Sequence, residues 1–147
     1  DTRNFALTAQ QREKHSEAYR IELIKNVATE KSSAQDTSVL LLDAAPLFKA
    51  LLDDIQAGLP KGFIAQCFHD AFVRAIVDLA ELVRGVYGIS LVALGGGVFM
   101  NRYLTERALA QLQERGFTVA MNKDLPPNDA SISYGQAVLG WQAQTKE

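Results

Sequence analysis

The sequence predicts an α/β fold, in which a largely helical first half is followed by a unit that alternates strand and helix. Apolar residues at three- and four-residue spacing indicate helices over much of the chain. Two short apolar runs, Ser90 to Leu94 and Phe117 to Met121, have the length and flanking turn residues of strands. A helical pattern lies between these runs, so at least two of the strands are expected to be parallel.

The first forty residues are predicted to form a helix, a loop and the start of a strand. Thr8 and Gln11 form a possible capping box, and the helix that they begin is expected to continue to about Glu30. The composition of residues 31–37 is typical of a loop. The apolar run from Val39 to Leu42 predicts a short buried strand, and we place the boundary between an N-terminal segment (1–37) and the main lobe (38–147) just before it.

Two helices are predicted in the middle of the chain. Pro46 suits the first turn of a helix whose apolar side contains Leu47, Leu51, Leu52 and Ile55, and Gly58-Leu59-Pro60 ends it. The next helical pattern runs from about Ile64 until Tyr87-Gly88, which makes it the expected central core helix.

The last third of the chain contains the expected β-turn-α unit. Three glycines follow Ser90 to Leu94, which is expected to be a buried strand, and a helix is predicted from about Asn101 to Arg115, with Gly116 closing it. After the strand at Phe117 to Met121, a loop with Pro126-Pro127 leads to a last helix from near Asp129 to about Gln142.

The bulk composition narrows the class of protein. The chain has 147 residues, 48% of them hydrophobic, a net charge of −2 and one cysteine. These values predict a soluble domain in a reducing, cytoplasmic setting, with no internal disulfide and no overall basic footprint for nucleic acid. No stretch is long and apolar enough to cross a membrane, and the absence of an initial methionine suggests that the sequence is part of a longer one.

The triplet Gly95-Gly96-Gly97 is the main candidate for chemistry. Three residues without Cβ at the C-terminal end of a strand allow a positive φ and a close approach of a ligand to the backbone amides. The following helix adds unpaired N–H groups and the positive end of its dipole, which favour a phosphate. The spacing is neither that of a dinucleotide-binding motif nor that of a P-loop, so a tight turn with close helix–strand packing is an equal alternative.

Four other side chains have chemistry that a site could use. The Asp129 carboxylate is expected either to cap the last helix or to bind a hard metal ion, with capping favoured. His69 is expected to be partly buried and hydrogen-bonded, and His15 to be solvated. Cys67 has no cationic neighbour in the sequence, so it is interpreted as a packing residue.

Several of these motifs together resemble the hydrogenase maturation carbamoyltransferase family HypF. The stretch from Leu94 to Arg102 with Leu104, Glu106 and Arg107 is similar to that family's glycine signature. The PPND sequence at 126–129 and the GQA sequence at 135–137 follow in the family's order and spacing. An upstream stretch, from Pro46 through Gly58-Leu59-Pro60 to His69, resembles the segment that precedes the signature.

The resemblance implies the second lobe of an actin-like ATPase fold, related to ribonuclease H, with a short mixed sheet packed by helices. It also implies a share in passing a carbamoyl group from carbamoyl-adenylate to the C-terminal cysteine of the acceptor protein HypE, a step in making the cyanide ligand of nickel–iron hydrogenase. The partners it implies are HypE, a nucleotide and the missing N-terminal domains of the same enzyme.

The resemblance also assigns roles to residues. Gly95, Gly96, Gly97 and Asn101 would hold the phosphate and sugar of ATP or carbamoyl-adenylate. Asp129 would be this lobe's ligand to a divalent metal (Zn, Fe or Mg) that is shared with histidines of a missing first lobe. His69 is a possible catalytic residue. The family's serine before the glycine pair is replaced by Gly95, and glycines after its aspartate are replaced by Ala130 and Ser131.

Two other functions are also consistent with these residues. One is another actin-like carbamoyl- or threonylcarbamoyl-transferase with a different acceptor, and the other is a non-catalytic interaction module that keeps the fold. With half of the cleft absent, we expect this chain alone to bind nucleotide with a Kd of about 1 mM or weaker and to transfer nothing.

Overall fold

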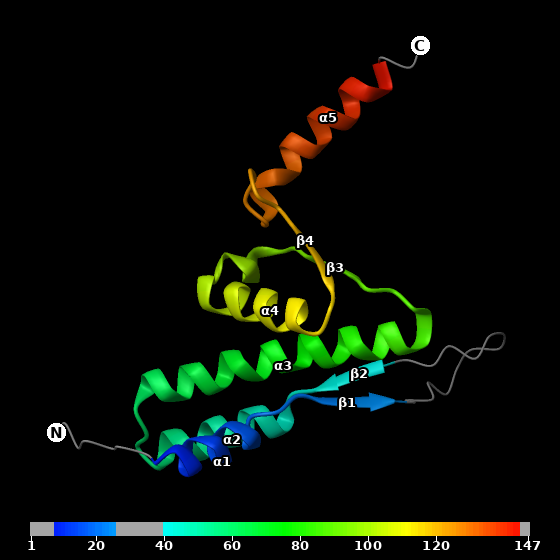
Figure 1. The fold of residues 1–147 in the computed structure, drawn as a ribbon. Helices are drawn as coiled ribbons and strands as arrows, with labels where there is room; N and C mark the ends of the chain where they lie inside the picture. The colour runs from blue at the N-terminus through cyan, green and yellow to red at the C-terminus, as the bar shows by residue number, and fades with distance from the viewer. Residues whose placement is uncertain (1–7, 26–39, 145–147) are drawn as a thin grey trace, which may run out of the picture. The chain divides into compact units, whose positions relative to one another are not determined.

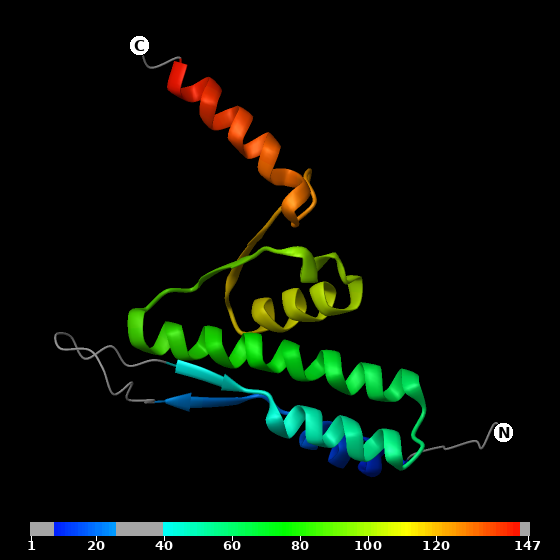
Figure 2. The ribbon, with the colours of Figure 1, turned by 180° about the vertical axis from the view of Figure 1, so that it is seen from behind.

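The computed structural model describes residues 8–25 and 40–144. Its helices and strands fall into two compact units, unit 1 (Asp1–Leu79) and unit 2 (Ala80–Glu147). Helix α3 (Lys61–Tyr87) contributes its first part to unit 1 and its last turns to unit 2. The elements are coloured in chain order in Figure 1 and are seen from behind in Figure 2.

Unit 1 consists of helices and a two-stranded antiparallel sheet. Its elements are α1 (Ala9–Ala18), β1 (Glu22–Lys25), β2 (Leu40–Asp43), α2 (Ala45–Gln56) and the first part of α3. In the sheet, Leu23 pairs with Leu42 and Ile24 with Leu41. The predicted capping box at the start of α1 is confirmed: the Gln11 N–H donates to Thr8 Oγ1 (3.3 Å) and the Thr8 N–H donates to Gln11 Oε1 (2.9 Å).

The prediction of one helix from Thr8 to about Glu30 is wrong beyond Ala18. The chain turns to an extended conformation at Tyr19, and β1 follows. The Arg74 guanidinium stabilises this break, because it donates to the carbonyl oxygens of Ser16 (2.9 Å) and Tyr19 (2.7 Å) at the end of α1. A contact from a residue so distant in the sequence overrides the local helical pattern. Residues 26–30 and the predicted loop at 31–37 lie outside the described residues.

The strand predicted at Val39 to Leu42 is present as β2, but it is not a buried strand. The side chains of Leu41 and Leu42 are 42% and 53% exposed. The reason is that β2 belongs to a sheet of only two strands among the described residues, and this sheet leaves apolar side chains uncovered.

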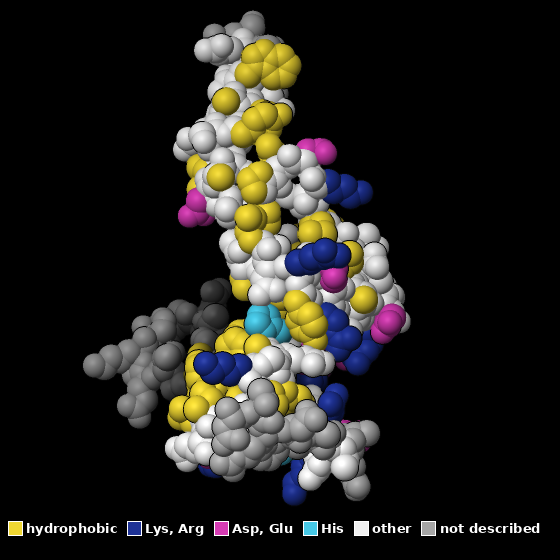
Figure 3. Space-filling view, turned by 90° about the vertical axis from the view of Figure 1, so that its left-hand side faces the viewer, with side chains coloured by type: hydrophobic (Ala, Val, Ile, Leu, Met, Phe, Trp, Pro, Cys, Tyr) yellow, Lys and Arg dark blue, Asp and Glu magenta, His cyan; other side chains and the backbone are white. Residues whose placement is uncertain are grey.

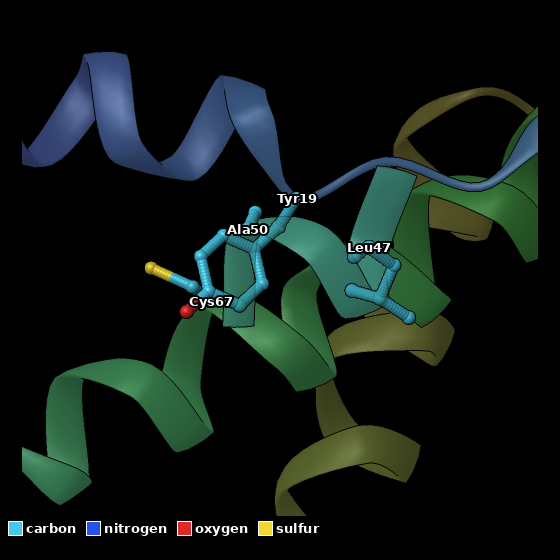
Figure 4. Close-up of a cluster of buried hydrophobic side chains, with 5 residues drawn as sticks. Tyr19, Leu47, Ala50 and Cys67 are labelled. Carbon is cyan, nitrogen blue, oxygen red and sulfur yellow. The ribbon is translucent and has the colours of Figure 1, made fainter. Parts of the chain in front are cut away.

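The core of unit 1 forms where α1, α2 and α3 meet. Tyr19, Leu47, Ala50, Cys67 and Ala71 are buried there, and Figure 4 shows four of them labelled. The bounds predicted for α2 are confirmed: Pro46 lies in its first turn, and Gly58 follows its end with φ +73°. Of its predicted apolar side, Leu47 is buried, whereas Leu52 and Ile55 are each 55% exposed. The long apolar pattern forms the continuous helix α3, as expected.

Unit 2 contains the predicted strand–turn–helix–strand sequence. Its elements after α3 are β3 (Leu91–Leu94), the 3₁₀ helix η1 (Gly97–Met100), α4 (Arg102–Glu114), β4 (Thr118–Met121), the 3₁₀ helix η2 (Asp129–Ser131) and α5 (Ile132–Gln144). Strands β3 and β4 pair in parallel, which confirms the α/β class. The first strand was expected to be buried, yet only Leu94 is buried and Leu91 is 59% exposed. One face of α4 supplies the buried residues Leu104, Ala108 and Leu112.

The end of α3 is fixed to the turn between α4 and β4. The Arg84 guanidinium lies 4.0 Å from the centre of the Phe117 ring and donates to the carbonyl oxygen of Arg115 at 2.8 Å. Arg115 in turn forms an ion pair with Glu81 at 2.9 Å. These contacts link the last turns of α3 to the residues just before β4. Among the described residues, no helix is long and apolar enough to span a membrane.

Candidate functional site

The candidate site lies at one edge of the parallel pair in unit 2. Leu94 and Met121, the last residues of β3 and β4, are paired in register. The glycine turn (Gly95–Gly97) and the loop 122–128 therefore leave the sheet from the same edge. In open α/β sheets, this carboxyl edge is where ligands bind.

The glycine turn and the loop are in direct contact. The Gly96 N–H donates to the carbonyl oxygen of Pro127 at 2.6 Å. A Cβ on Gly97 would lie 3.8 Å from the Cβ of Asn128, which is ordinary van der Waals distance. The structure thus brings together two segments, about thirty residues apart, that the sequence predicted as parts of one site.

The outer side of the turn is open. A Cβ added to Gly95 or Gly96 would meet no atom within 4 Å, so close packing by the described residues does not require glycine at either position. The tight turn is present, because Gly96 has φ +102°, but the close helix–strand packing suggested as its purpose is absent there. This geometry leaves the backbone accessible to a ligand.

The backbone amides at this turn are unequally available. The Gly96 N–H is already bonded to Pro127. At the start of η1, the Phe99 N–H donates to the carbonyl oxygen of Gly96. The N–H groups of the two preceding residues, Gly97 and Val98, have no acceptor among the described residues. These two amides are the donors that the turn can offer to an anion.

Asn101 is the N-cap of α4. Its Oδ1 accepts the Leu104 N–H at 3.1 Å, and its own N–H donates to Val98 O at 3.0 Å. The side-chain oxygen thus has a structural partner, and it couples the start of α4 to the glycine turn through Val98. Its predicted contact with a nucleotide stays a prediction.

Asp129 is exposed and begins η2, but it is not the cap. Asn128 has that role: its backbone is extended, and its Oδ1 accepts the Ala130 N–H at 3.2 Å. The expectation that Asp129 caps the last helix is wrong, because the residue before it already occupies the capping position. Among the described residues, no three His, Cys, Asp or Glu side chains gather to hold a metal ion. Asp129 alone therefore does not fit a metal centre, and its predicted role in a shared one stays a prediction.

His69 belongs to α3 in unit 1. Its Nδ1 lies 2.6 Å from the carbonyl oxygen of Ala65, and its ring is partly buried against the edge of Phe68, as the sequence predicted. It lines a mainly apolar groove of about 640 Å³ between α2 and α3. The candidate site residues are thus divided: the turn, Asn101 and Asp129 lie in unit 2, and His69 lies in unit 1.

Comparison with known proteins agrees with the motifs that form this edge. Residues 5–136 match the family model of the carbamoyltransferase Kae1-like domain, second subdomain. The chain belongs to the HypF carbamoyltransferase family. It is similar to the carbamoyltransferase HypF of Synechocystis, with 36% identity over 105 residues, which are 71% of this chain and 13% of the relative.

Other HypF proteins show the same partial coverage. The HypF2 carbamoyltransferase of Cupriavidus necator is 36% identical over 101 residues, which are 69% of this chain and 12% of that protein. The crystal structure of full-length HypF in its phosphate- and nucleotide-bound form matches with a TM-score of 0.68 and 35% identity, over 85% of this chain and 15% of that one. The fold expected from the resemblance, the second lobe of an actin-like domain, is confirmed, and the chain spans a small fraction of these HypF proteins.

Unit 1 contains a polar cluster that the sequence did not predict. His15 was expected to be solvated, but its Nδ1 lies 2.8 Å from Asp54 Oδ1. The Tyr19 hydroxyl donates to Asp54 Oδ2 at 3.0 Å, and Asp54 is only 4% exposed. Burial and the neighbouring Asp54 raise the pKa of Tyr19 above its ordinary value. The sequence does carry one signal that Asp54 is buried. Asp54 lies at helical spacing from Leu47 and Ala50, so it falls on the buried face of α2.

Cys67 is a packing residue, as expected. Its side chain is buried in the core of unit 1 at 2% exposure. Burial, with smaller contributions from Asp54 and Asp70, raises the pKa of the thiol to about 11. The sulfur is therefore protonated near neutral pH and is a poor nucleophile.

Proposed function

We propose that this chain is the nucleotide-binding second lobe of a carbamoyltransferase domain. In the full domain, a carbamoyl group would pass from carbamoyl-adenylate to the C-terminal cysteine of HypE. The observation that carries the proposal is the open glycine turn at the carboxyl edge of two parallel strands, held against the loop 126–129 by the bond from Gly96 N–H to Pro127 O. Membership of the HypF family, and a matched structure described as nucleotide-bound, support it.

The turn fits a phosphate better than it fits a base or a sugar. The N–H groups of Gly97 and Val98 are donors without acceptors among the described residues, and no side chain at Gly95 or Gly96 blocks approach. Donors aimed at phosphate oxygens stabilise negative charge on the leaving nucleotide, which is the main task in transfer from an acyl-adenylate. Asn101 would hold η1 and α4 in the register that presents these donors.

Two candidate residues need the rest of the enzyme. Asp129 is exposed and follows Asn128, the residue that neighbours the glycine turn. In this proposal it would supply one carboxylate to a divalent metal whose other ligands would come from a first lobe. His69 remains a candidate catalytic residue without a derived step. The proposal includes a cytoplasmic location, since carbamoyl transfer to HypE would occur there.

A reconstitution tests this function. The 147-residue chain would be co-expressed with Synechocystis HypF that ends before its aligned segment, and HypE would be the acceptor. We expect the intact mass of HypE to rise by one carbamoyl group only when both pieces, ATP and carbamoyl phosphate are present. Each piece alone should leave HypE unmodified, because orientation of thiolate and carbonyl needs both halves of the cleft. A complex that forms and binds nucleotide but never modifies HypE would contradict the proposal.

One observation favours a second candidate, a non-catalytic docking lobe. Ala130 and Ser131 carry side chains where the family has glycines, and the Ser131 hydroxyl donates to the Pro126 carbonyl, which braces the loop beside the turn. A lobe of this kind would bind HypF-type partners without any response to nucleotide. The absence of ligand-induced change at the turn, together with complex formation, would select it.

A further inference from the structure

The 3₁₀ helix η1 carries the N–H groups of Gly97 and Val98, yet it has little packing of its own. It is four residues long, and none of its residues is buried. Val98 and Met100 are each 59% exposed. In Figure 3, where the side of unit 2 that contains η1 faces the viewer, hydrophobic side chains lie open at the surface. Because a short 3₁₀ turn has poor hydrogen-bond geometry, contacts from outside must fix its position.

Hydrogen bonds to other elements hold both ends of η1. Just before its start, the Gly96 N–H donates to the carbonyl oxygen of Pro127, in the loop after β4. Near its other end, the Thr105 hydroxyl of α4 donates to the carbonyl oxygen of Phe99 at 2.9 Å. The last carbonyl groups of a helix have no partner further along the same helix, and this bond satisfies one of them. The 3₁₀ helix is therefore fixed between the loop and α4.

The Thr105 side chain does not make the bond that is common for a threonine in a helix. Such a hydroxyl usually donates to a carbonyl oxygen three or four residues earlier in the same helix. The Thr105 hydroxyl instead reaches a carbonyl six residues earlier, in a different element. Its backbone N–H meanwhile donates to Asn101 O at 3.0 Å, as in a regular first turn. The hydroxyl thus ties η1 to a helix that is anchored by the buried residues Leu104 and Ala108.

We propose that Thr105 is a positioning residue for the nucleotide phosphates. By holding the Phe99 carbonyl, its hydroxyl sets the direction in which the N–H groups of Gly97 and Val98 point. Donors that are already ordered bind a phosphate more tightly than donors that must be ordered on binding. Thr105 itself would touch no ligand. This inference rests on the proposed function, because that function assigns the two N–H groups to phosphate.

Two substitutions at this position separate the hydroxyl from the shape of the side chain. Thr105→Val keeps the size and the branched Cβ but removes the donor, so the Phe99 carbonyl loses its bond to α4. Thr105→Ser keeps the donor and should behave like the parent chain. Thr118→Val makes the same chemical change in β4, where the side chain is exposed, and serves as the control.

Amide hydrogen exchange of the ligand-free chain tests whether Thr105 fixes η1. The reporters are the N–H groups of Phe99 and Asn101, which donate to Gly96 O and Val98 O at the two ends of the 3₁₀ helix. We expect exchange at both to be at least about fivefold faster in Thr105→Val, because one hydrogen bond to the turn is lost. Thr105→Ser and the control should keep the parent rates. Unchanged exchange in Thr105→Val would overturn the inference.

Titration of the same ¹⁵N-labelled variants with ATP tests the link to phosphate. We expect the amide shifts of Gly97 and Val98 in Thr105→Val to need at least about threefold more ATP than in the parent chain, and Thr105→Ser to restore the response. A merely structural role would lower the melting temperature of Thr105→Val without changing its response to ATP, and that result would overturn the inference alone. If these two amides of the parent chain do not respond to ATP, the proposed function fails and this inference fails with it.

Discussion

At the scale of single residues, the buried side chain of Asp54 links the end of α1 to α2. Its two oxygens accept from the Tyr19 hydroxyl and contact His15 Nδ1, and its charge is almost fully removed from water. Replacement by alanine leaves the buried Tyr19 hydroxyl without its acceptor. We expect Asp54→Ala to lower the free energy of unfolding by about 1–3 kcal/mol in urea titrations.

The neighbouring residue provides the control for Asp54. Asp53 is exposed and pairs with Lys49 at 2.8 Å across one turn of α2. A surface pair of this kind contributes little, so Asp53→Ala should change the free energy of unfolding by less than about 0.5 kcal/mol. Equal losses from the two substitutions would show that burial of the Asp54 cluster is not what stabilises unit 1.

Cys67 gives a prediction for pH dependence. Burial raises the pKa of its thiol from an ordinary value of 9.0 to about 11, so the folded state holds this proton more tightly than the unfolded chain does. The resulting stabilisation is complete below about pH 9 and is lost as the pH rises to about 11. Chemical denaturation at pH 8, 9, 10 and 11 should therefore show a steeper loss of stability in the parent chain than in Cys67→Ala. Parallel curves would contradict this account.

At the scale of elements, the glycine turn depends on one glycine more than on its neighbour. Gly96 has φ +102°, which is costly for any residue with a Cβ, whereas Gly95 lacks a positive φ and faces open space. We expect Gly96→Ala to lower the free energy of unfolding by about 1 kcal/mol or more and Gly95→Ala to change it by less than about 0.5 kcal/mol. Thermal melts monitored by circular dichroism distinguish the two, and similar melts would mean that the turn relaxes without cost.

The sequence predicted the elements whose stability is local. Helices α2, α3 and α4 were predictable because their apolar spacing, Pro46 and the closing glycines all act within a few residues. The end of α1 was not predictable, because it depends on hydrogen bonds from Arg74, which is more than fifty residues away in the sequence. The exposure of β2 and β3 was also missed, since an apolar run is the same in a buried strand and in a strand of a small, open sheet.

The candidate site was predictable in part for the same reason. Motif order identified the turn, Asn101 and the loop 126–129 as parts of one site, and their contact through Gly96 and Pro127 agrees. The sequence did not predict that Asn128, and not Asp129, is the N-cap. Both residue types cap helices well, and only the backbone conformation decides which of the two does so here. The His15–Asp54 contact joins two helices, so no local sequence pattern predicts it. The one sign of it in the sequence is the acidic residue Asp54 on an apolar face of α2.

At the scale of the whole molecule, the chain is a lobe with half of a proposed cleft. It belongs to the HypF carbamoyltransferase family and spans 12–15% of the HypF proteins compared above. At the sheet edge, the described residues supply two backbone N–H groups without acceptors and one exposed carboxylate, but no complete set of metal ligands. Under the proposed function, the transfer step would need residues from outside this chain.

The central claim is that the glycine turn binds the phosphates of a nucleotide. The most direct measurement is a titration of the ¹⁵N-labelled chain with ATP, followed by the amide resonances of residues 95–101 and 127–129, with adenosine as the ligand that lacks phosphates. We predict shifts centred on Gly97 and Val98, with a Kd of about 1 mM or weaker, and no matching shifts with adenosine. Shifts confined to another surface, or equal shifts with ATP and adenosine, would contradict the claim.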